Sequence, residues 1–218
     1  MARPEPSAAG YPLAFRRASG ELGTRDLAEA ARRAGARLEG RRLQLAWLGI
    51  PVEVEPSRDP GGEAAFRPAD LPLAEKILIL HYLLSAGQQP VRGRLVSFKQ
   101  LPGASFYEPT YRKRGPERIA RRFGRDPEAF RRACLKLGWE SGGLGDASCS
   151  FEVFPRLRGE VVLHRGDEEF PPEANLLFED RIVNLLPLED VAVLAGLVAS
   201  RLSKAAQSAD AGEGPAEP

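Results

Sequence analysis

Residues 71–85 read LPLAEKILILHYLLS and form the most apolar stretch of this chain. Asp70 precedes the stretch as a candidate N-cap, and Gly87 follows it as a candidate helix terminator. The middle of the stretch is apolar on nearly every side, which is typical of a helix inside a core rather than on a surface. We therefore expect a buried helix here, with the rest of the fold packed around it.

Strand and helix signals alternate on both sides of this helix. Apolar and polar residues alternate over 43–47 and again over 52–54, which predicts a β-hairpin around Gly49. Further strands are predicted at 91–98, 151–154 and 160–164, and further helices at 24–34, 116–123, 126–137 and 188–204. Most connections between strands are short. The expected fold class is therefore α+β, with a mainly antiparallel sheet and helices packed on one face.

The length of 218 residues fits a single domain with loose ends. Residues 1–10 are rich in Pro and Ala, and residues 205–218 are small, polar and acidic, so both ends are expected to be disordered. Residues 11–204 are expected to form the one α+β domain.

Charge and composition argue against several classes of protein. The formal net charge is +1, which disfavours a protein that binds nucleic acid over its whole surface. No stretch approaches the roughly 20 apolar residues of a membrane span, and the first ten residues lack the apolar run of a secretory signal. The sequence thus predicts a soluble cytoplasmic protein without a membrane partner, whose binding partner is a small molecule or another protein.

The chain has two cysteines, Cys134 and Cys149, whose spacing matches no zinc site. Cys134 shares a helical stripe with Phe130 and Leu137, which favours a packing role. Two reduced core thiols are expected, although a single disulfide between them stays open. No metal is predicted, and the sequence identifies no cofactor.

A basic stretch around the predicted helix at 116–123 is the first candidate for chemistry. Four arginines recur at helical spacing and share one face: Arg118, Arg121, Arg122 and Arg125. Guanidinium groups suit phosphates and carboxylates, so this face is a candidate site for an anion or RNA. Tyr107 and Tyr111 precede it and could stack on a planar ligand. The simpler interpretation is a solvated charged face.

An acidic stretch between Asp167 and Asp190 is the second candidate. Its clearest run is GDEEFP at 166–171, where Asp167, Glu168 and Glu169 stand side by side. Such carboxylates could bind a hard cation or raise one another's pKa to create a general acid. Neither interpretation is specific, because no calcium-loop pattern is present and His164 is the nearest imidazole. A structural use, in capping a turn and pairing with arginines, is the alternative.

His81 lies within the core helix, on the stripe of Leu73, Ile77 and Leu84. A hydrogen-bonded core histidine is the favoured interpretation there, ahead of a ligand or a base. No nucleophile elbow, Walker A loop, HExxH or CxxC motif occurs in the chain.

Four segments in this order resemble a known family. They are EKILILHYLL at 75–84, GRLVSFKQL at 93–101, GDEEFP at 166–171, and the pair LFED at 177–180 with LED at 188–190. Together they resemble domain-of-unknown-function family 3786 of bacteria and archaea, over about residues 24–204. The resemblance implies no established activity.

Some relatives in that family are joined to an iron–sulfur domain, in settings of one-carbon and corrinoid metabolism. This chain lacks the cysteines of such a cluster, so the resemblance does not imply cluster binding here. A typical member has an aromatic residue where this chain has His164. What the resemblance implies is a candidate ligand surface: His81, Tyr82, Phe98, Asp167, Glu168, Glu169, Phe170, Pro171 and Asp180.

The leading hypothesis is a non-catalytic ligand-binding or accessory domain that uses the GDEEFP turn and nearby aromatics, Tyr107 among them. This hypothesis is based on a rigid Phe-Pro-Pro turn that presents three carboxylates, in a chain that has no recognisable nucleophile motif. The alternatives are an enzyme that depends on a metal or on these carboxylates, and an anion- or RNA-binding protein that uses the arginine face. The sequence does not decide whether the chain is an enzyme.

Overall fold

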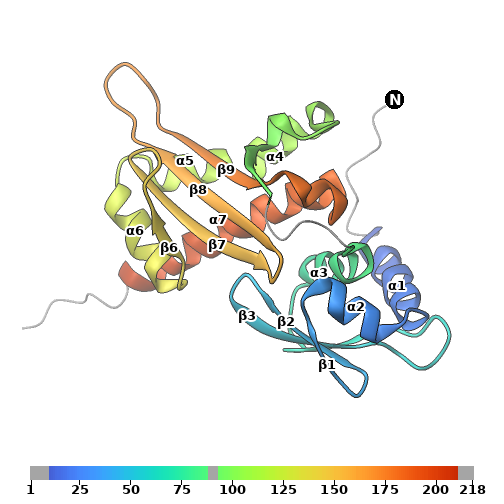
Figure 1. Cartoon of the computed structure of the whole chain (residues 1–218). Coiled ribbons are helices and arrows are strands. Elements are labelled where there is room, and N and C mark those ends of the chain that lie inside the picture. Colours follow the sequence, from blue (N-terminus) through green and yellow to red (C-terminus); the bar gives the residue numbers. More distant parts are fainter. Residues whose placement is uncertain (1–9, 88–92, 211–218) are drawn as a thin grey trace, which may run out of the picture. The chain divides into compact units, whose positions relative to one another are not determined.

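The computed structural model describes residues 10–87 and 93–210. The chain divides into two compact units. Of the described residues, unit 1 comprises 10–87, 153–156 and 184–186, and unit 2 comprises 93–152, 157–183 and 187–210. Figure 1 shows the elements of both units.

Unit 1 contains a four-stranded antiparallel sheet in the order β1-β2-β3-β4. The strands are β1 Arg37–Glu39, β2 Arg42–Trp47, β3 Ile50–Glu55 and β4 Ala65–Arg67, and the helices are α1 Gly10–Gly23, α2 Leu27–Ala34 and α3 Leu73–Ser85. The strand alternation seen in the sequence holds, because Leu43, Leu45 and Trp47 are buried while their neighbours are more exposed. Helix α3 packs against α1 and α2.

The core of unit 1 is built around α3 and its aromatic contacts. Tyr82 is fully buried, stacks on Phe154 at a ring distance of 3.9 Å, and donates a hydrogen bond to the Ala34 carbonyl at 2.7 Å. Trp47 Nε1 donates to the carboxylate of Glu75, which is buried on the same helix. These contacts explain why such an apolar helix belongs in the core.

Unit 2 contains a five-stranded antiparallel sheet in the order β5-β9-β8-β7-β6. The strands are β5 Leu95–Ser97, β6 Glu140–Gly142, β7 Ala147–Phe154, β8 Leu157–His164 and β9 Glu173–Glu179. Strands β8 and β9 form a long hairpin whose connecting loop extends beyond the sheet (Figure 1).

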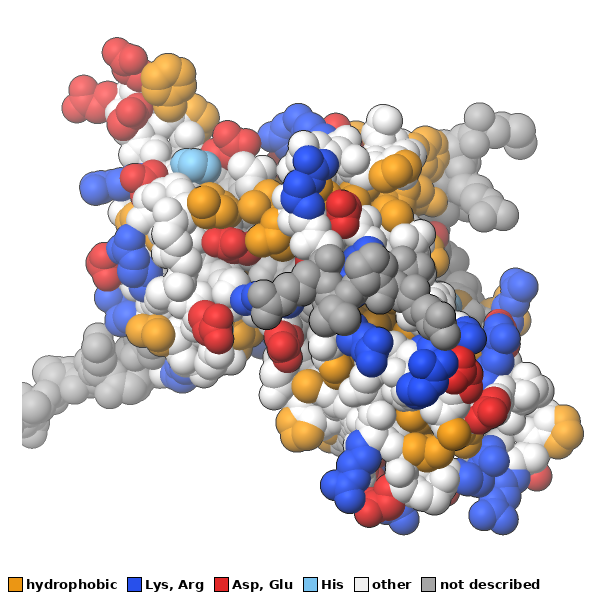
Figure 2. Space-filling model, viewed as in Figure 1, with side chains coloured by type: hydrophobic (Ala, Val, Ile, Leu, Met, Phe, Trp, Pro, Cys, Tyr) orange, Lys and Arg blue, Asp and Glu red, His pale blue; other side chains and the backbone are white. Residues whose placement is uncertain are grey.

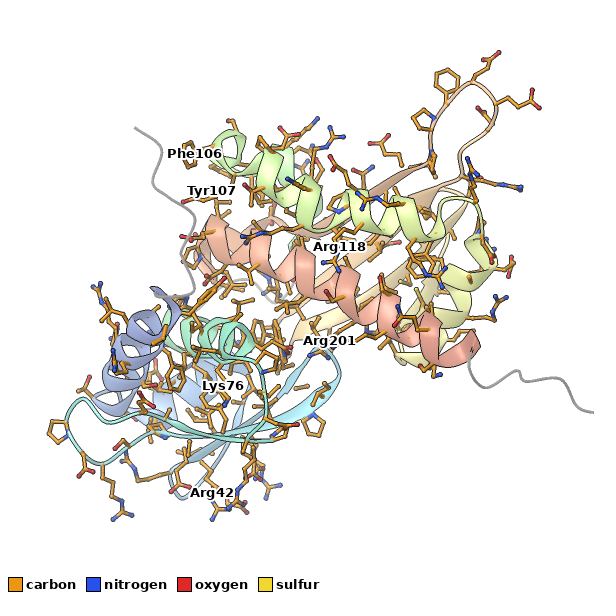
Figure 3. The ribbon with its side chains drawn as sticks, turned by 180° about the vertical axis from the view of Figure 1, so that it is seen from behind. Arg42, Lys76, Phe106, Tyr107, Arg118 and Arg201 are labelled. Atoms are coloured by element: carbon orange, nitrogen blue, oxygen red, sulfur yellow. The ribbon has the colours of Figure 1, made fainter. Side chains whose placement is uncertain are left out.

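Four α-helices accompany this sheet: α4 Glu108–Arg114, α5 Pro116–Phe123, α6 Pro127–Lys136 and α7 Leu188–Asp210. Helix α5 packs on β8 and β9, and α7 packs on α4, α5 and α6. Two short 3-10 helices, η1 Phe98–Gln100 and η2 Ala104–Phe106, join β5 to α4, and η3 Asp180–Asn184 follows β9. Seen from either side, α5 and α7 lie on the same face of the sheet (Figures 1 and 3).

The α+β class and the antiparallel pairing expected from the sequence are confirmed. The described strands divide between two sheets, where the sequence suggested one. The predicted caps of α6 are also confirmed, because Asp126 accepts a hydrogen bond from the Ala129 N–H and Pro127 is the first helical residue. Within residues 10–87 and 93–210, no helix has both the length and the apolar character needed to cross a bilayer.

Three sequence predictions need correction. Asp70 does not cap α3, which begins after Pro72 at Leu73, whereas the predicted end of the helix at Ser85 is confirmed, with Ala86 as its C-cap. The strand predicted at 91–98 is limited to 95–97, with residues 91–92 outside the described part. The tail predicted to be disordered from 205 is helical to Asp210, because Ala205 and Ala206 are still buried.

Among the described elements, helix α1, helix α4 and strand β9 are the longest that the sequence did not reveal. Residues 1–9 and 211–218, which the disorder prediction also covered, lie outside the described residues.

Candidate functional site

The two edges of strand β9 are paired over different lengths. On one edge, β8 pairs with β9 from Glu173 to Phe178. On the other edge, β5 reaches only from Glu179 back to Leu177, where Ser97 is its last residue. Phe98 then turns into η1, so β5 ends just before it would pair with Leu176. Among residues 10–87 and 93–210, no strand therefore pairs with residues 173–176 of β9 on this edge.

A tyrosine occupies part of the vacant edge. The Tyr111 hydroxyl donates a hydrogen bond to the Leu176 carbonyl at 2.8 Å. Its ring stacks on Phe98 at a ring distance of 4.0 Å and an angle of 9°, and both side chains are buried. Burial raises the pKa of Tyr111 well above its usual value, so this hydroxyl is held as a neutral donor.

A pocket of about 140 Å³ lies beside this edge. Its floor is apolar and aromatic, whereas its rim carries charged and amide side chains. It is smaller than the roughly 300–1,000 Å³ of sites for drug-sized ligands. The lining residues come from the end of β5, η1, α4, α5 and β9, and the ones that matter below are Phe98, Lys99, Glu108, Tyr111, Arg112, Glu117, Ala174 and Leu176.

Two ion pairs stand at the rim of the pocket. Lys99 Nζ lies 3.2 Å from a Glu108 carboxylate oxygen, and Arg112 Nε lies 3.6 Å from a Glu117 carboxylate oxygen. Lys99 and Arg112 are 64% and 52% exposed, so each pair stabilises the fold by about 0–1 kcal/mol at most. Such pairs can exchange partners with a charged ligand at little cost.

The GDEEFP turn lies at the tip of the β8–β9 hairpin. The side chains of Asp167, Glu168, Glu169 and Phe170 are exposed, Phe170 to 66%. They do not line the pocket beside β9. Figure 2 shows the carboxylates and an apolar side chain gathered on this projection.

One carboxylate of this turn has a structural role. Asp167 accepts hydrogen bonds from the backbone N–H groups of Glu169 and Phe170, at 2.9 and 2.7 Å. The Asp167 N–H donates in turn to the Phe170 carbonyl at 2.9 Å. The carboxylate and the N–H of Asp167 therefore both stabilise the turn, while Glu168 and Glu169 project into solvent.

The remaining ligand candidates fall into different places. His81, which is half-buried, and Tyr82, which is buried, belong to unit 1, whereas the other candidates belong to unit 2. Tyr107 is half-buried at the start of α4, and its ring meets Phe106 edge-on (Figure 3). Asp180 is exposed, and its N–H donates to the Arg94 carbonyl at 2.9 Å.

Of the candidate ligand residues, only Phe98 lines the pocket. The pocket also uses Tyr111, which the sequence singled out as a stacking aromatic. Lys99, Glu108 and Ala174 had no signal in the sequence, because they share a site only through the pairing of β9 with β5.

The four arginines of the candidate anion face differ in their surroundings. The guanidinium of Arg118 donates to the Gly196 carbonyl at 3.4 Å and to Ser200 Oγ at 3.1 Å, so it links α5 to α7 (Figure 3). Arg122 lies over the ring of Phe123 at 5.3 Å. Arg121 and Arg125 are exposed. Of the four arginines on this predicted face, one therefore has a structural role and three lie at the surface.

Within the part of the chain that the structure describes, no group of three or more His, Cys, Asp or Glu side chains is placed to hold a metal ion. Cys134 and Cys149 are buried free thiols, in agreement with the prediction of reduced core cysteines. A hydrogen bond with Cys134, together with burial, raises the pKa of the Cys149 thiol. Such a thiol is a poor nucleophile.

Comparison with known proteins yields one match. The model of the family described as "Domain of unknown function (DUF3786)" matches residues 26–201. No curated protein matches the chain, and no solved structure matches it either.

Proposed function

The chain belongs to the DUF3786 family, and we propose that it serves there as a non-catalytic binding domain whose ligand occupies the pocket beside β9. One observation carries this proposal: an aromatic floor, an incompletely paired strand edge and two exposed ion pairs meet in one concave site. Ligand pockets commonly combine an apolar body with a few polar groups that fix orientation.

The residues in the pocket favour binding over catalysis. The lining contains neither an imidazole nor a thiol, which are the commonest bases and nucleophiles. Its serine, Ser97, donates its hydroxyl to the Gln100 side chain at 3.2 Å and caps η1. The lining groups are thus suited to holding a ligand.

The rim indicates the charge of the ligand. Lys99 and Arg112 can receive a carboxylate, while Glu108 and Glu117 can receive an ammonium group. The pocket volume of about 140 Å³ corresponds to a molecule of amino-acid size. We therefore expect a small polar ligand that carries one or both of these charges. A corrin macrocycle does not fit inside, so the link to corrinoid metabolism stays a prediction that requires another surface.

The proposal can be tested by titrating isotopically labelled protein with glycine, L-alanine, acetate, methylammonium and cobinamide while recording amide NMR spectra. We expect at least one of the four small probes to shift the amides of Tyr111, Ala174 and Leu176. Lys99→Met or Arg112→Met should weaken the binding of a probe that carries a carboxylate about tenfold, because each removes one charge-assisted contact.

Arg121→Met is the matched control, since Arg121 is exposed on the neighbouring helix and does not line the pocket. Shifts confined to other surfaces, or no shifts with any probe, would show that the pocket is not a small-molecule site. Conversion of a probe during the titration would overturn the non-catalytic assignment.

A further inference from the structure

The backbone groups of β9 alternate between its two edges, and two hydrogen bonds fix which residues face which edge. The Asp180 N–H bonds to Arg94, next to β5. The Leu176 carbonyl accepts from Tyr111 on that same side. Because successive residues alternate in an antiparallel ladder, residues 174, 176 and 178 direct their N–H and C=O groups away from β8.

A contact on β8 supports the same assignment independently. The Leu163 carbonyl accepts a hydrogen bond from the Asp146 N–H, on the side of β7. Leu163 therefore turns its backbone groups away from β9, although it lies directly opposite Ala174 in the register. The backbone groups of Ala174 must then also turn away from β8, toward the pocket.

The vacant edge thus presents a defined set of backbone groups. Between Glu173 and Leu176, these are the N–H and C=O of Ala174 and the N–H of Leu176. No hydrogen bond to them is made by residues 10–87 or 93–210 on that edge, and both residues line the pocket. Ala174 and Leu176 are only 2% and 1% exposed, so unpaired groups here are costly and favour a partner.

We propose that this edge of β9 binds an extended peptide segment of another protein as an added strand, in line with β5. This inference rests on the proposed function, because it takes the same pocket as the binding site and specifies its ligand. The peptide residue opposite Ala174 exchanges two backbone hydrogen bonds with it, and a further carbonyl accepts from the Leu176 N–H.

A peptide backbone matches this pattern, and the pocket of about 140 Å³ then holds a single residue of the peptide, the one opposite Ala174. The donor of Leu176 and the groups of Ala174 repeat every second residue, roughly 7 Å apart, which is the repeat of a β-strand. Strand addition at a sheet edge with unpaired backbone groups is a recurrent mode of peptide recognition. The rim pairs of Lys99 with Glu108 and of Arg112 with Glu117 stand where they can contact side chains of the added segment.

The test uses a neutral, strand-favouring probe, the capped peptide acetyl-Thr-Val-Thr-Val-Thr-amide. The matched control peptide is N-methylated at every residue, which removes its backbone donors. Amide hydrogen exchange of the full chain is measured with and without each peptide.

In the free protein, we expect the Ala174 and Leu176 amides to exchange at least tenfold faster than the Asn175 and Leu177 amides, which face β8. The unmethylated peptide should slow exchange at Ala174 and Leu176 at least tenfold and leave Asn175 unchanged. The methylated peptide should slow neither.

A variant tests the same bond from the side of the protein. Ala174→Pro removes the edge N–H while leaving the ladder with β8 intact, and proline is tolerated on strand edges. We expect Ala174→Pro to weaken peptide binding about fivefold or more, because it removes one hydrogen bond to the peptide. Ala174→Ser keeps the N–H and should bind as the unchanged protein does. If Ala174→Pro fails to fold, the exchange comparison alone decides.

The outcomes separate this inference from the proposed function. If glycine or acetate shifts the pocket amides while the peptide does not protect Ala174, the pocket is a small-molecule site and the strand-addition inference is wrong. Slow exchange at Ala174 in the free protein would also overturn the inference, because these groups would already be paired. Binding of neither class of probe would overturn both.

Discussion

The tip of the β8–β9 hairpin and the start of strand β9 that follows it differ in how they use their polar groups. At the tip, Asp167 satisfies the turn's own backbone, and the neighbouring side chains point into solvent. At the start of β9, directly after the loop, the Ala174 backbone faces a pocket in which the described chain leaves it unpaired. The acidic GDEEFP turn, which stands out in the sequence, therefore satisfies its own backbone groups. The start of β9, which does not stand out in the sequence, has backbone groups that a partner can pair.

This difference indicates that a high density of charged side chains is a weak guide to the position of a binding site. Exposed carboxylates are already well solvated, so a partner gains little by contacting them. Buried backbone donors and acceptors have lost water without gaining a partner, so a ligand that pairs them gains more. The contrast between the hairpin tip and the start of β9 can be broken or sharpened by substitution.

The largest effect should come from the aromatic floor of the pocket. Phe98→Ala should lower the free energy of unfolding by about 3–5 kcal/mol, because a fully buried ring stacked on Tyr111 is lost. Phe170→Ala at the tip should change it by less than about 0.5 kcal/mol, since that ring is 66% exposed. Urea unfolding measures both, and equal losses would remove the contrast.

The hydroxyl at the strand edge should give the next largest effect. Tyr111→Phe leaves the Leu176 carbonyl without this donor and should cost about 1–3 kcal/mol. Tyr107→Phe is the matched control, because its half-buried ring keeps its contact with Phe106. A neutral result for Tyr111→Phe would mean that water replaces the hydroxyl at this edge.

The same tyrosine predicts a pH dependence. Burial raises the folded-state pKa of Tyr111 above its ordinary value of 10.0, so the unfolded chain releases this proton first. The stability that depends on the neutral phenol is present below pH 10 and is lost as the pH rises above 10. In urea unfolding at a series of pH values, the deficit of Tyr111→Phe should therefore narrow above pH 10. A constant deficit would contradict the assigned burial.

The smallest effect should come from the turn at the tip. Asp167→Ala removes the acceptor for the Glu169 and Phe170 N–H groups and should cost about 0.5–1 kcal/mol, as for an exposed hydrogen bond. Amide exchange at Glu169 and Phe170 should become faster. Glu168→Ala should leave both stability and exchange unchanged, and an equal effect of the two substitutions would show that Asp167 has no special role.

Much of the local structure follows from signals that lie within a few residues of one another. The alternation over 43–47 and 52–54 predicted the β2–β3 hairpin, and Asp126 with Pro127 predicted the start of α6. The apolar run at 71–85 predicted the core helix, although Asp70 was wrongly assigned as its cap. Helix α1 was missed because no capping side chain marks its start, and its first and last turns carry no favourable charges.

The sequence by itself determined the α+β class, most helices and strands, and the family to which the chain belongs. Only the tertiary structure decided that β5 ends opposite Leu177, that Tyr111 reaches the Leu176 carbonyl, and that a pocket opens beside Ala174. The physical reason is that local propensity depends on near neighbours, whereas these contacts join residues about 65 to 80 positions apart. Their pairing register is set by the packing of the whole unit and leaves no trace in the composition of any single segment.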